Sequence, residues 1–148
     1  MSSESSGSYS FNILLVEDNP GDARLAQEAL TENHVNHILY HVEDGLQALD
    51  FLYKRGVYHS SPRPDLILLD LNLPKIKGHQ VLVEIKSDES LKKIPVVILS
   101  ISQSEKDIER SYELNANCYI TKPLDINEFI EVFGRIQNFW LKTVKLPV

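Results

Sequence analysis

The chain contains short continuous apolar runs that are separated by longer stretches with apolar residues at helical spacing. Continuous runs of β-favouring residues, at 11–16, within 64–74 and at 94–99, are typical of strands buried on both faces of a parallel sheet. Shorter, more mixed runs at 37–42 and 117–121 predict two further strands. The three most apolar runs are therefore expected at the centre of the sheet.

Helices are predicted between these runs because apolar residues there recur three and four positions apart. Asn19-Pro20 favours a helix start, and Ser104 with Asp107 resembles an N-terminal cap. The expected helical stretches are 20–33, 46–52, 81–85, 104–114 and 125–136. Five strands alternating with five helices predict an α/β fold, a doubly wound five-stranded parallel sheet with helices on both faces.

Length and composition favour one globular domain. The chain has 148 residues, of which 43% are hydrophobic and 24% charged. The net charge of −6 argues against a nucleic-acid surface, which needs a basic stripe. No apolar run approaches the ~20 residues of a membrane helix. The lone Cys118 favours a reduced, cytoplasmic setting, and the Ser-rich residues 1–10 are expected to be a disordered leader, not a signal peptide.

Several chemically active side chains follow the ends of the predicted strands. They are Glu17 and Asp18 after the first strand, Asp70 after the third, Ser100 after the fourth and Lys122 after the fifth. Because parallel strands present their carboxyl ends at one edge, these side chains are expected to meet where ligands of open α/β sheets bind. Each alone has an ordinary structural role, as a cap, a strand-end hydroxyl or a surface charge. Their gathering at one edge favours a functional site.

The predicted cluster favours phosphoryl chemistry with a metal ion. Two carboxylates ~4 Å apart repel each other by about 4 kcal/mol at an effective dielectric constant near 20, so three of them need cations. Lys122 supplies one positive charge, and few carboxylates with water suit Mg²⁺ better than Ca²⁺. Beside such cations, Asp70 is able to act as a nucleophile toward phosphorus, with Ser100 as a hydrogen-bond donor.

In these positions the chain resembles the receiver domain of response regulators in two-component signalling. The matching residues are Glu17-Asp18, Asp70 with Leu73-Pro74 and Gly78, Ser100, and Tyr119 with Lys122-Pro123. The resemblance covers about residues 13–137, and it sets a receiver domain at 11–138 and an apolar tail at 139–148. It implies that Asp70 accepts a phosphoryl group from a sensor histidine kinase.

The resemblance also implies roles for the other site residues. Mg²⁺ would be bound by Asp18, Asp70 and the backbone carbonyl of Asn72, with Glu17 acting through water. Tyr119 would be the switch aromatic, and the Lys122-Pro123 peptide would be cis. Two features depart from the family pattern, namely Lys77 in place of an acid before the glycine and a long loop at 56–64.

Within the family the chain is most similar to single-domain regulators paired with cyanobacterial and bacterial phytochromes. This similarity rests on Ser61-Pro62-Arg63-Pro64 before the third strand and on Phe139-Trp140-Leu141 in the tail. It implies a phytochrome as the kinase. The tail residues are expected either to fold back onto the domain or to join the last helix in a homodimer. We favour the dimer because the apolar face of that helix already packs on the core, which leaves little core surface for the tail.

Two other function classes compete with this interpretation. The first is a phosphohydrolase with an aspartyl nucleophile, in which a second Asp usually lies two residues after the first. Asn72 occupies that position here and cannot transfer protons. The second is a binding module, either a cofactor carrier or a receiver that is never phosphorylated. The complete set of acids, hydroxyl and lysine argues against a degenerate receiver.

Overall fold

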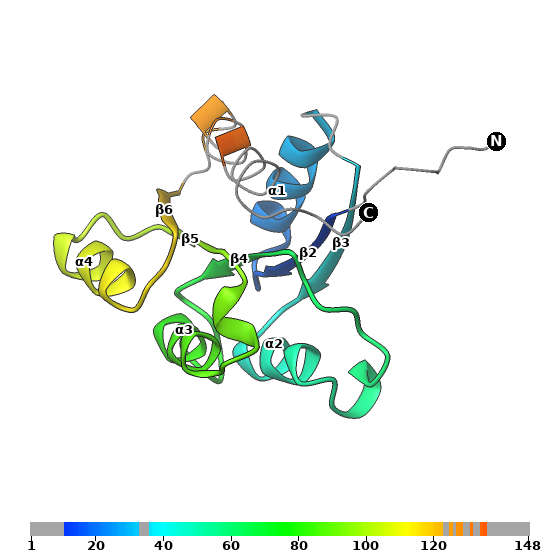
Figure 1. The fold of residues 1–148 in the computed structure, drawn as a ribbon. Helices are drawn as coiled ribbons and strands as arrows, with labels where there is room; N and C mark the ends of the chain where they lie inside the picture. The colour runs from blue at the N-terminus through cyan, green and yellow to red at the C-terminus, as the bar shows by residue number, and fades with distance from the viewer. Residues whose placement is uncertain are drawn as a thin grey trace.

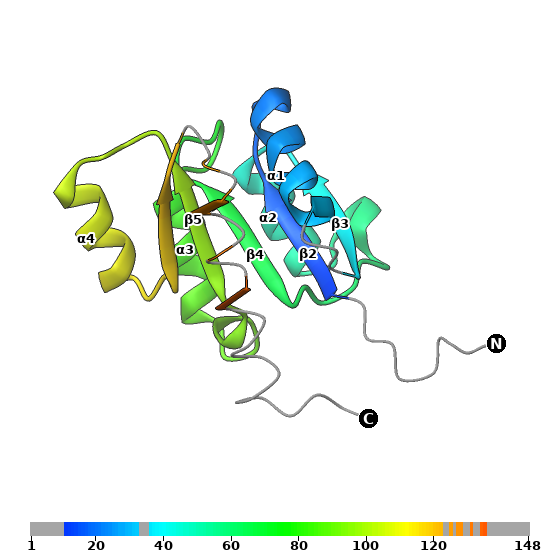
Figure 2. The same ribbon diagram turned by 90° about the horizontal axis from the view of Figure 1, so that it is seen from above.

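A computed structural model describes residues 11–32, 36–122, 125, 127–128, 131 and 134–135 (Figures 1 and 2). The expected leader at 1–10, the tail at 139–148 and the Lys122-Pro123 peptide lie outside the described residues, as does most of the expected last helix. None of the helices that the structure describes is long and apolar enough to cross a bilayer.

The five strands form one parallel sheet. They are β2 (Phe11–Val16), β3 (His37–Val42), β4 (Leu66–Asp70), β5 (Val96–Ser100) and β6 (Cys118–Thr121), and their order in the sheet is β3-β2-β4-β5-β6. The register pairs Val16 with Leu69 and Asp70 with Leu99. The three most apolar runs are therefore the central strands, and every residue of β4 and β5 is buried. The predicted fold class and the predicted central strands are confirmed.

Helices cover both faces of this sheet because successive strand residues point to opposite sides. Leu14, Val16 and Ile67 pack in one core with α2 (Gly45–Leu52) and α3 (Gly78–Ser87). Ile13, Leu15 and Leu68 pack in the other core with α1 (Pro20–Glu32). Figure 1 shows α1 on one side of the sheet, with α2 and α3 on the other.

α4 (Glu105–Glu113) lies beyond β6, on the same side as α3, and contributes little to the core (Figure 1). Ser111 is its only buried residue, and its hydroxyl lies 3.1 Å from the ring nitrogen Nε2 of His79 on α3. Short 3₁₀ helices, η1 (Gly56–Tyr58) and η2 (Leu91–Lys93), interrupt the loops before β4 and β5. η1 lies in the loop at 56–64 that was expected to be long for the family.

The order of the strands determines at which point of the sheet edge a ligand is expected to bind. From β2 the chain passes to β3 on one side, and it later returns to β4 on the other side of β2. The crevice beyond the carboxyl ends of β2 and β4 is therefore the topological switch point, where α/β sheets bind ligands. Glu17 and Asp18 follow β2 there, and Asp70 ends β4.

Candidate phosphoryl-acceptor and metal site

Three carboxylates meet at the switch point, as predicted. One oxygen each from Glu17, Asp18 and Asp70 lies within 4.8 Å of the other two, which is close enough to share a metal ion. Glu17 and Asp70 are buried, with 1% and 4% of their surface exposed, whereas Asp18 is exposed. The cluster is thus two buried acids with a solvent-facing third, a set of hard oxygen ligands that suits Mg²⁺.

Lys122 brings the compensating charge into the same pocket from the end of β6. Its ammonium nitrogen Nζ lies 2.6 Å from Oε1 of Glu17 and 3.5 Å from Oδ2 of Asp70. The lysine is itself buried, with 7% of its surface exposed, so these contacts are weakly screened by solvent. Of these two contacts, the one with Glu17 has hydrogen-bond length, whereas the one with Asp70 is an ion pair alone.

The site holds more negative charge than Lys122 can balance. Burial raises the pKa of Glu17 to about 7, and the charge of Asp70 adds to that rise although the hydrogen bond from Lys122 opposes it. Burial alone would lower the pKa of Lys122, but hydrogen bonds to Glu17 and Asp22 outweigh burial and raise that pKa. A buried acid that resists ionisation beside a strongly held cation indicates a place for a further positive ion.

Backbone groups orient the two buried carboxylates. The N–H of Asn72 donates to Oδ1 of Asp70 over 3.1 Å, and the N–H of Asn19 donates to Oε2 of Glu17 over 3.2 Å. A Cβ atom on Gly78 would lie 2.5 Å from the carbonyl oxygen of Asp70, so only glycine lets α3 begin against the chain that follows β4. This close approach explains Gly78 in the family pattern.

Comparisons with known proteins agree with this geometry. Residues 13–133 match the family model described as the response regulator receiver domain. The chain belongs to that family. It is also 51% identical to the response regulator Rcp1 of Synechocystis sp. over 135 residues, which cover 91% of this chain and 92% of the relative.

Two solved structures of response regulators are similar to this chain in both sequence and fold. The phosphorylated cyanobacterial phytochrome response regulator RcpA is 51% identical, covers 95% of this chain and all (100%) of its own, and superposes with a TM-score of 0.80. The Mn²⁺-bound form of Rcp1 is 50% identical, covers 93% of this chain and 99% of its own, and gives a TM-score of 0.79. The resemblance to phytochrome response regulators is confirmed.

The two predicted switch residues, Ser100 and Tyr119, are linked through the loop after β5. Ser100 is fully buried, and its hydroxyl oxygen accepts a hydrogen bond of 3.1 Å from the N–H of Ser102. The hydroxyl of Tyr119 donates to the carbonyl oxygen of Ser102 over 3.0 Å. Ser102 also donates from its own hydroxyl to Asp107 at the start of α4, over 2.6 Å. The predicted switch residues therefore share one backbone segment.

Two histidines of β3 and the single cysteine also have defined places in the structure. His37 and His41 lie on a strand, as expected, and Nε2 of His41 donates to the carbonyl oxygen of Glu17 over 2.7 Å, because a carbonyl only accepts. Cys118 is a half-buried free thiol, and burial raises its pKa.

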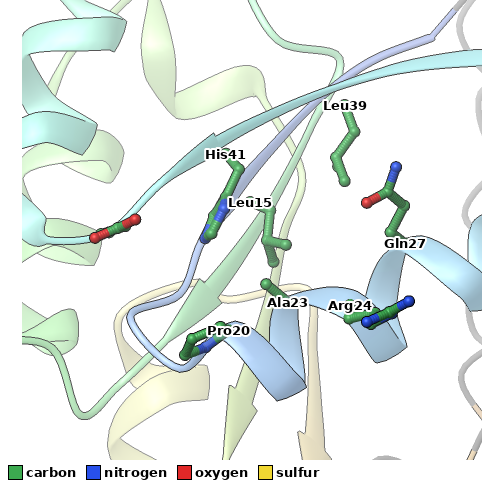
Figure 3. A pocket seen from close by; sticks show the side chains of 8 residues that line it. Leu15, Pro20, Ala23, Arg24, Gln27, Leu39 and His41 are labelled. Carbon is green, nitrogen blue, oxygen red and sulfur yellow. The ribbon is translucent and has the colours of Figure 1, made fainter.

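His41 also borders a cavity of about 350 Å³ between α1 and β3, which Figure 3 shows from close by. Its lining mixes apolar and polar side chains, namely Leu15, Pro20, Ala23, Arg24, Gln27, Leu39, His41 and Glu43. None of the three clustered carboxylates lines this cavity, so it is distinct from the acidic site.

Sequence reasoning missed one residue of the site. Asp22 lies in the first turn of α1, and its Oδ2 accepts a hydrogen bond of 2.9 Å from Nζ of Lys122. No local signal pointed to this contact, because its partner Lys122 lies 100 positions further along the chain. An acid in the first turn of a helix is otherwise read as a favourable dipole contact.

Proposed function

We propose that this receiver accepts a phosphoryl group on Asp70 from a phosphohistidine of a sensor histidine kinase of the phytochrome class. The observation that carries the proposal is the placement of Asp70. Its buried carboxylate lies 3.5 Å from the Lys122 ammonium and within the cluster of three metal-ligand oxygens. The similarity to phytochrome response regulators supports the choice of kinase.

The transfer itself is a displacement at phosphorus. One oxygen of the Asp70 carboxylate forms a bond to phosphorus as the phosphorus–nitrogen bond to the kinase imidazole breaks, and the nitrogen keeps the electron pair. Lys122 stabilises negative charge on the phosphoryl oxygens, and Ser100 donates a hydrogen bond to one of them. The product is an aspartyl phosphate on the receiver, so the chain acts as a phosphoacceptor and not as a catalyst of turnover.

The residues present fit a Mg²⁺ ion. We assign its binding to Asp18, Asp70 and the backbone carbonyl of Asn72, with Glu17 contributing through water. When bound, Mg²⁺ supplies positive charge that neutralises the transferring phosphoryl oxygens. The excess of carboxylates over lysine supports this assignment, as does the raised pKa of Glu17.

Phosphotransfer from an autophosphorylated phytochrome kinase tests the assignment. We expect rapid Mg²⁺-dependent labelling of the wild-type chain and loss of labelling in Asp70→Asn, which keeps the shape of the side chain and removes the nucleophile. Asp50→Asn is the matched control, because Asp50 is a surface acid paired with Arg55. Labelling of Asp70→Asn at the wild-type rate would refute Asp70 as the acceptor, and equal transfer from unrelated kinases would refute the phytochrome pairing.

The signal is proposed to leave the site through a changed protein surface in the cytoplasm, with a protein and not a nucleic acid as target. Ser100 and Tyr119 would couple phosphorylation to α4 through the loop that they share. We further propose a homodimer formed by the last helix and the tail at 139–148. Sedimentation of the full chain against a chain ending at Asn138 tests the dimer, and a monomer in both at high concentration would rule it out.

A further inference from the structure

The Lys122 ammonium is held off Asp70 by two other acids. Its Nζ lies 2.6 Å from Glu17, 2.9 Å from Asp22 and 3.5 Å from Asp70. The first two distances are those of charge-assisted hydrogen bonds, and the third is too long for one of comparable strength. In the unphosphorylated receiver the cation is therefore hydrogen-bonded on the side of β2 and α1.

Asp22 differs from the other acids around Lys122. Its side chain is 32% exposed, whereas the side chains of Glu17 and Asp70 are 1% and 5% exposed. It is presented by α1, whose first turn is tied down because the N–H of Asp22 donates to Oδ1 of Asn19 over 3.0 Å. Asp22 thus contacts Lys122 from the rim of the site, without belonging to the three-carboxylate cluster.

We propose that Asp22 is a positioning residue that restrains Lys122 away from Asp70 and thereby weakens the phosphorylated state. This inference rests on the proposed function. A phosphoryl group on Asp70 brings new anionic oxygens to the site, and Lys122 must turn an N–H toward them to stabilise their charge. Moving the ammonium toward those oxygens stretches its contact with Asp22, because Asp22 is the more exposed partner and holds the weaker of the two short contacts.

Removal of the competing acid is expected to favour the phosphorylated state. Beryllofluoride, which stands in for the phosphoryl group, is expected to bind Asp22→Asn about three- to tenfold more tightly than wild type at saturating Mg²⁺, the range of one contact to a partly exposed charge. Binding is measured by the ¹⁹F NMR signal of the bound species. Asp22→Glu keeps the carboxylate and is expected to return toward the wild-type affinity.

Two controls separate positioning from a general loss of negative charge. Glu28→Gln removes one charge from the same helix at a residue paired with the exposed Arg24, and it is expected to bind beryllofluoride as wild type does. The ¹⁵N NMR signal of the Lys122 ammonium in the ligand-free protein is expected to shift in Asp22→Asn and to stay in place in Glu28→Gln. A long-range charge effect would move both variants alike.

The beryllofluoride experiment distinguishes failure of the proposed function from failure of the proposed role of Asp22. Failure of wild type to bind beryllofluoride with Mg²⁺ would defeat the proposed function itself. Binding by wild type with equal or weaker binding by Asp22→Asn would overturn the role of Asp22 alone. An unshifted Lys122 signal in Asp22→Asn would do the same, because it would show that the ammonium is not held by this acid.

Discussion

The hydroxyl of Tyr119 donates a 3.0 Å hydrogen bond to the carbonyl oxygen of Ser102, two residues after the buried hydroxyl of Ser100. The same Ser102 holds Ser100 through its N–H and Asp107 through its side chain. A movement of the Ser100 hydroxyl toward a phosphoryl group would break its bond with Ser102, a residue that is also bonded to Tyr119 and to the first turn of α4. These hydrogen bonds would connect the proposed switch residues to α4.

Loss of the Tyr119 hydroxyl is expected to loosen this loop. Tyr119→Phe removes a hydrogen bond with a net value of about 1 kcal/mol, so amide hydrogen exchange at residues 101–104 is expected to accelerate about fivefold. Tyr112→Phe is the matched control because Tyr112 is exposed on α4. Equal exchange rates in the two variants would show that the bond does not order the loop.

Occupation of the phosphoryl site is expected to order the same region. With Mg²⁺ and beryllofluoride, amide exchange in residues 101–114 is expected to slow, because the Ser100 hydroxyl gains a partner and the loop settles into one arrangement. Mass-spectrometric exchange measures this change. If protection rises elsewhere and not in this segment, the output surface is not α4.

Metal binding is expected to depend more on Asp18 than on Glu17. Asp18 is the exposed member of the cluster, whereas Glu17 already accepts hydrogen bonds from Lys122 and from the N–H of Asn19. Mg²⁺ titration by calorimetry is expected to show about tenfold greater loss of affinity for Asp18→Ala than for Glu17→Ala. The reverse order would assign the direct ligand to Glu17.

The metal-free receiver is expected to lose stability as the pH rises. The folded-state pKa of Glu17, about 7, lies above its ordinary value of 4.5, so the stabilisation from its bound proton is complete below the ordinary value and lost as the pH passes the folded value. Thermal unfolding from about pH 5 to pH 8 measures this slope. Glu17→Gln is expected to flatten it, and an unchanged slope in that variant would assign the titration to another group.

Gly78→Ala is expected to disturb the site as well as the fold. Its Cβ would lie 2.5 Å from both the Asp70 carbonyl oxygen and the Leu71 Cα, which is expected to cost about 1–3 kcal/mol of unfolding free energy and to weaken beryllofluoride binding. Gly56→Ala serves for comparison, because Gly56 has a φ of +57° but no neighbour within 4 Å of its added Cβ. It is expected to lower stability and to leave binding unchanged.

The strands and the site were predictable from sequence because the central strands are buried on both faces of a parallel sheet. Residues 66–70 and 96–100 are buried on both faces, so their apolar runs are continuous, and parallel strands then force their end residues together. Glu17, Asp18, Asp70 and Lys122 meet as this argument requires.

The start of α3 and two contacts near the site depend on tertiary packing, which no local sequence pattern predicts. α3 begins at Gly78, three residues before Val81, the first apolar residue that marked this helix in the sequence. Lys77 provides no side-chain cap, and the helix start is set by packing against the backbone after β4. The bond from Tyr119 to Ser102 depends on the path of a loop, and the contact of Asp22 with Lys122 joins residues 100 positions apart.

The sparse packing of α4 has a consequence for how such receivers diversify. Because Ser111 is its only buried residue, most of its side chains are free to change at a cost near zero to the fold, within about 0.5 kcal/mol for each surface substitution. If α4 is the output surface proposed above, the choice of partner can change independently of the acid and lysine chemistry at the strand ends. Duplicated copies could then acquire new targets through α4 while each copy keeps the same acid and lysine cluster.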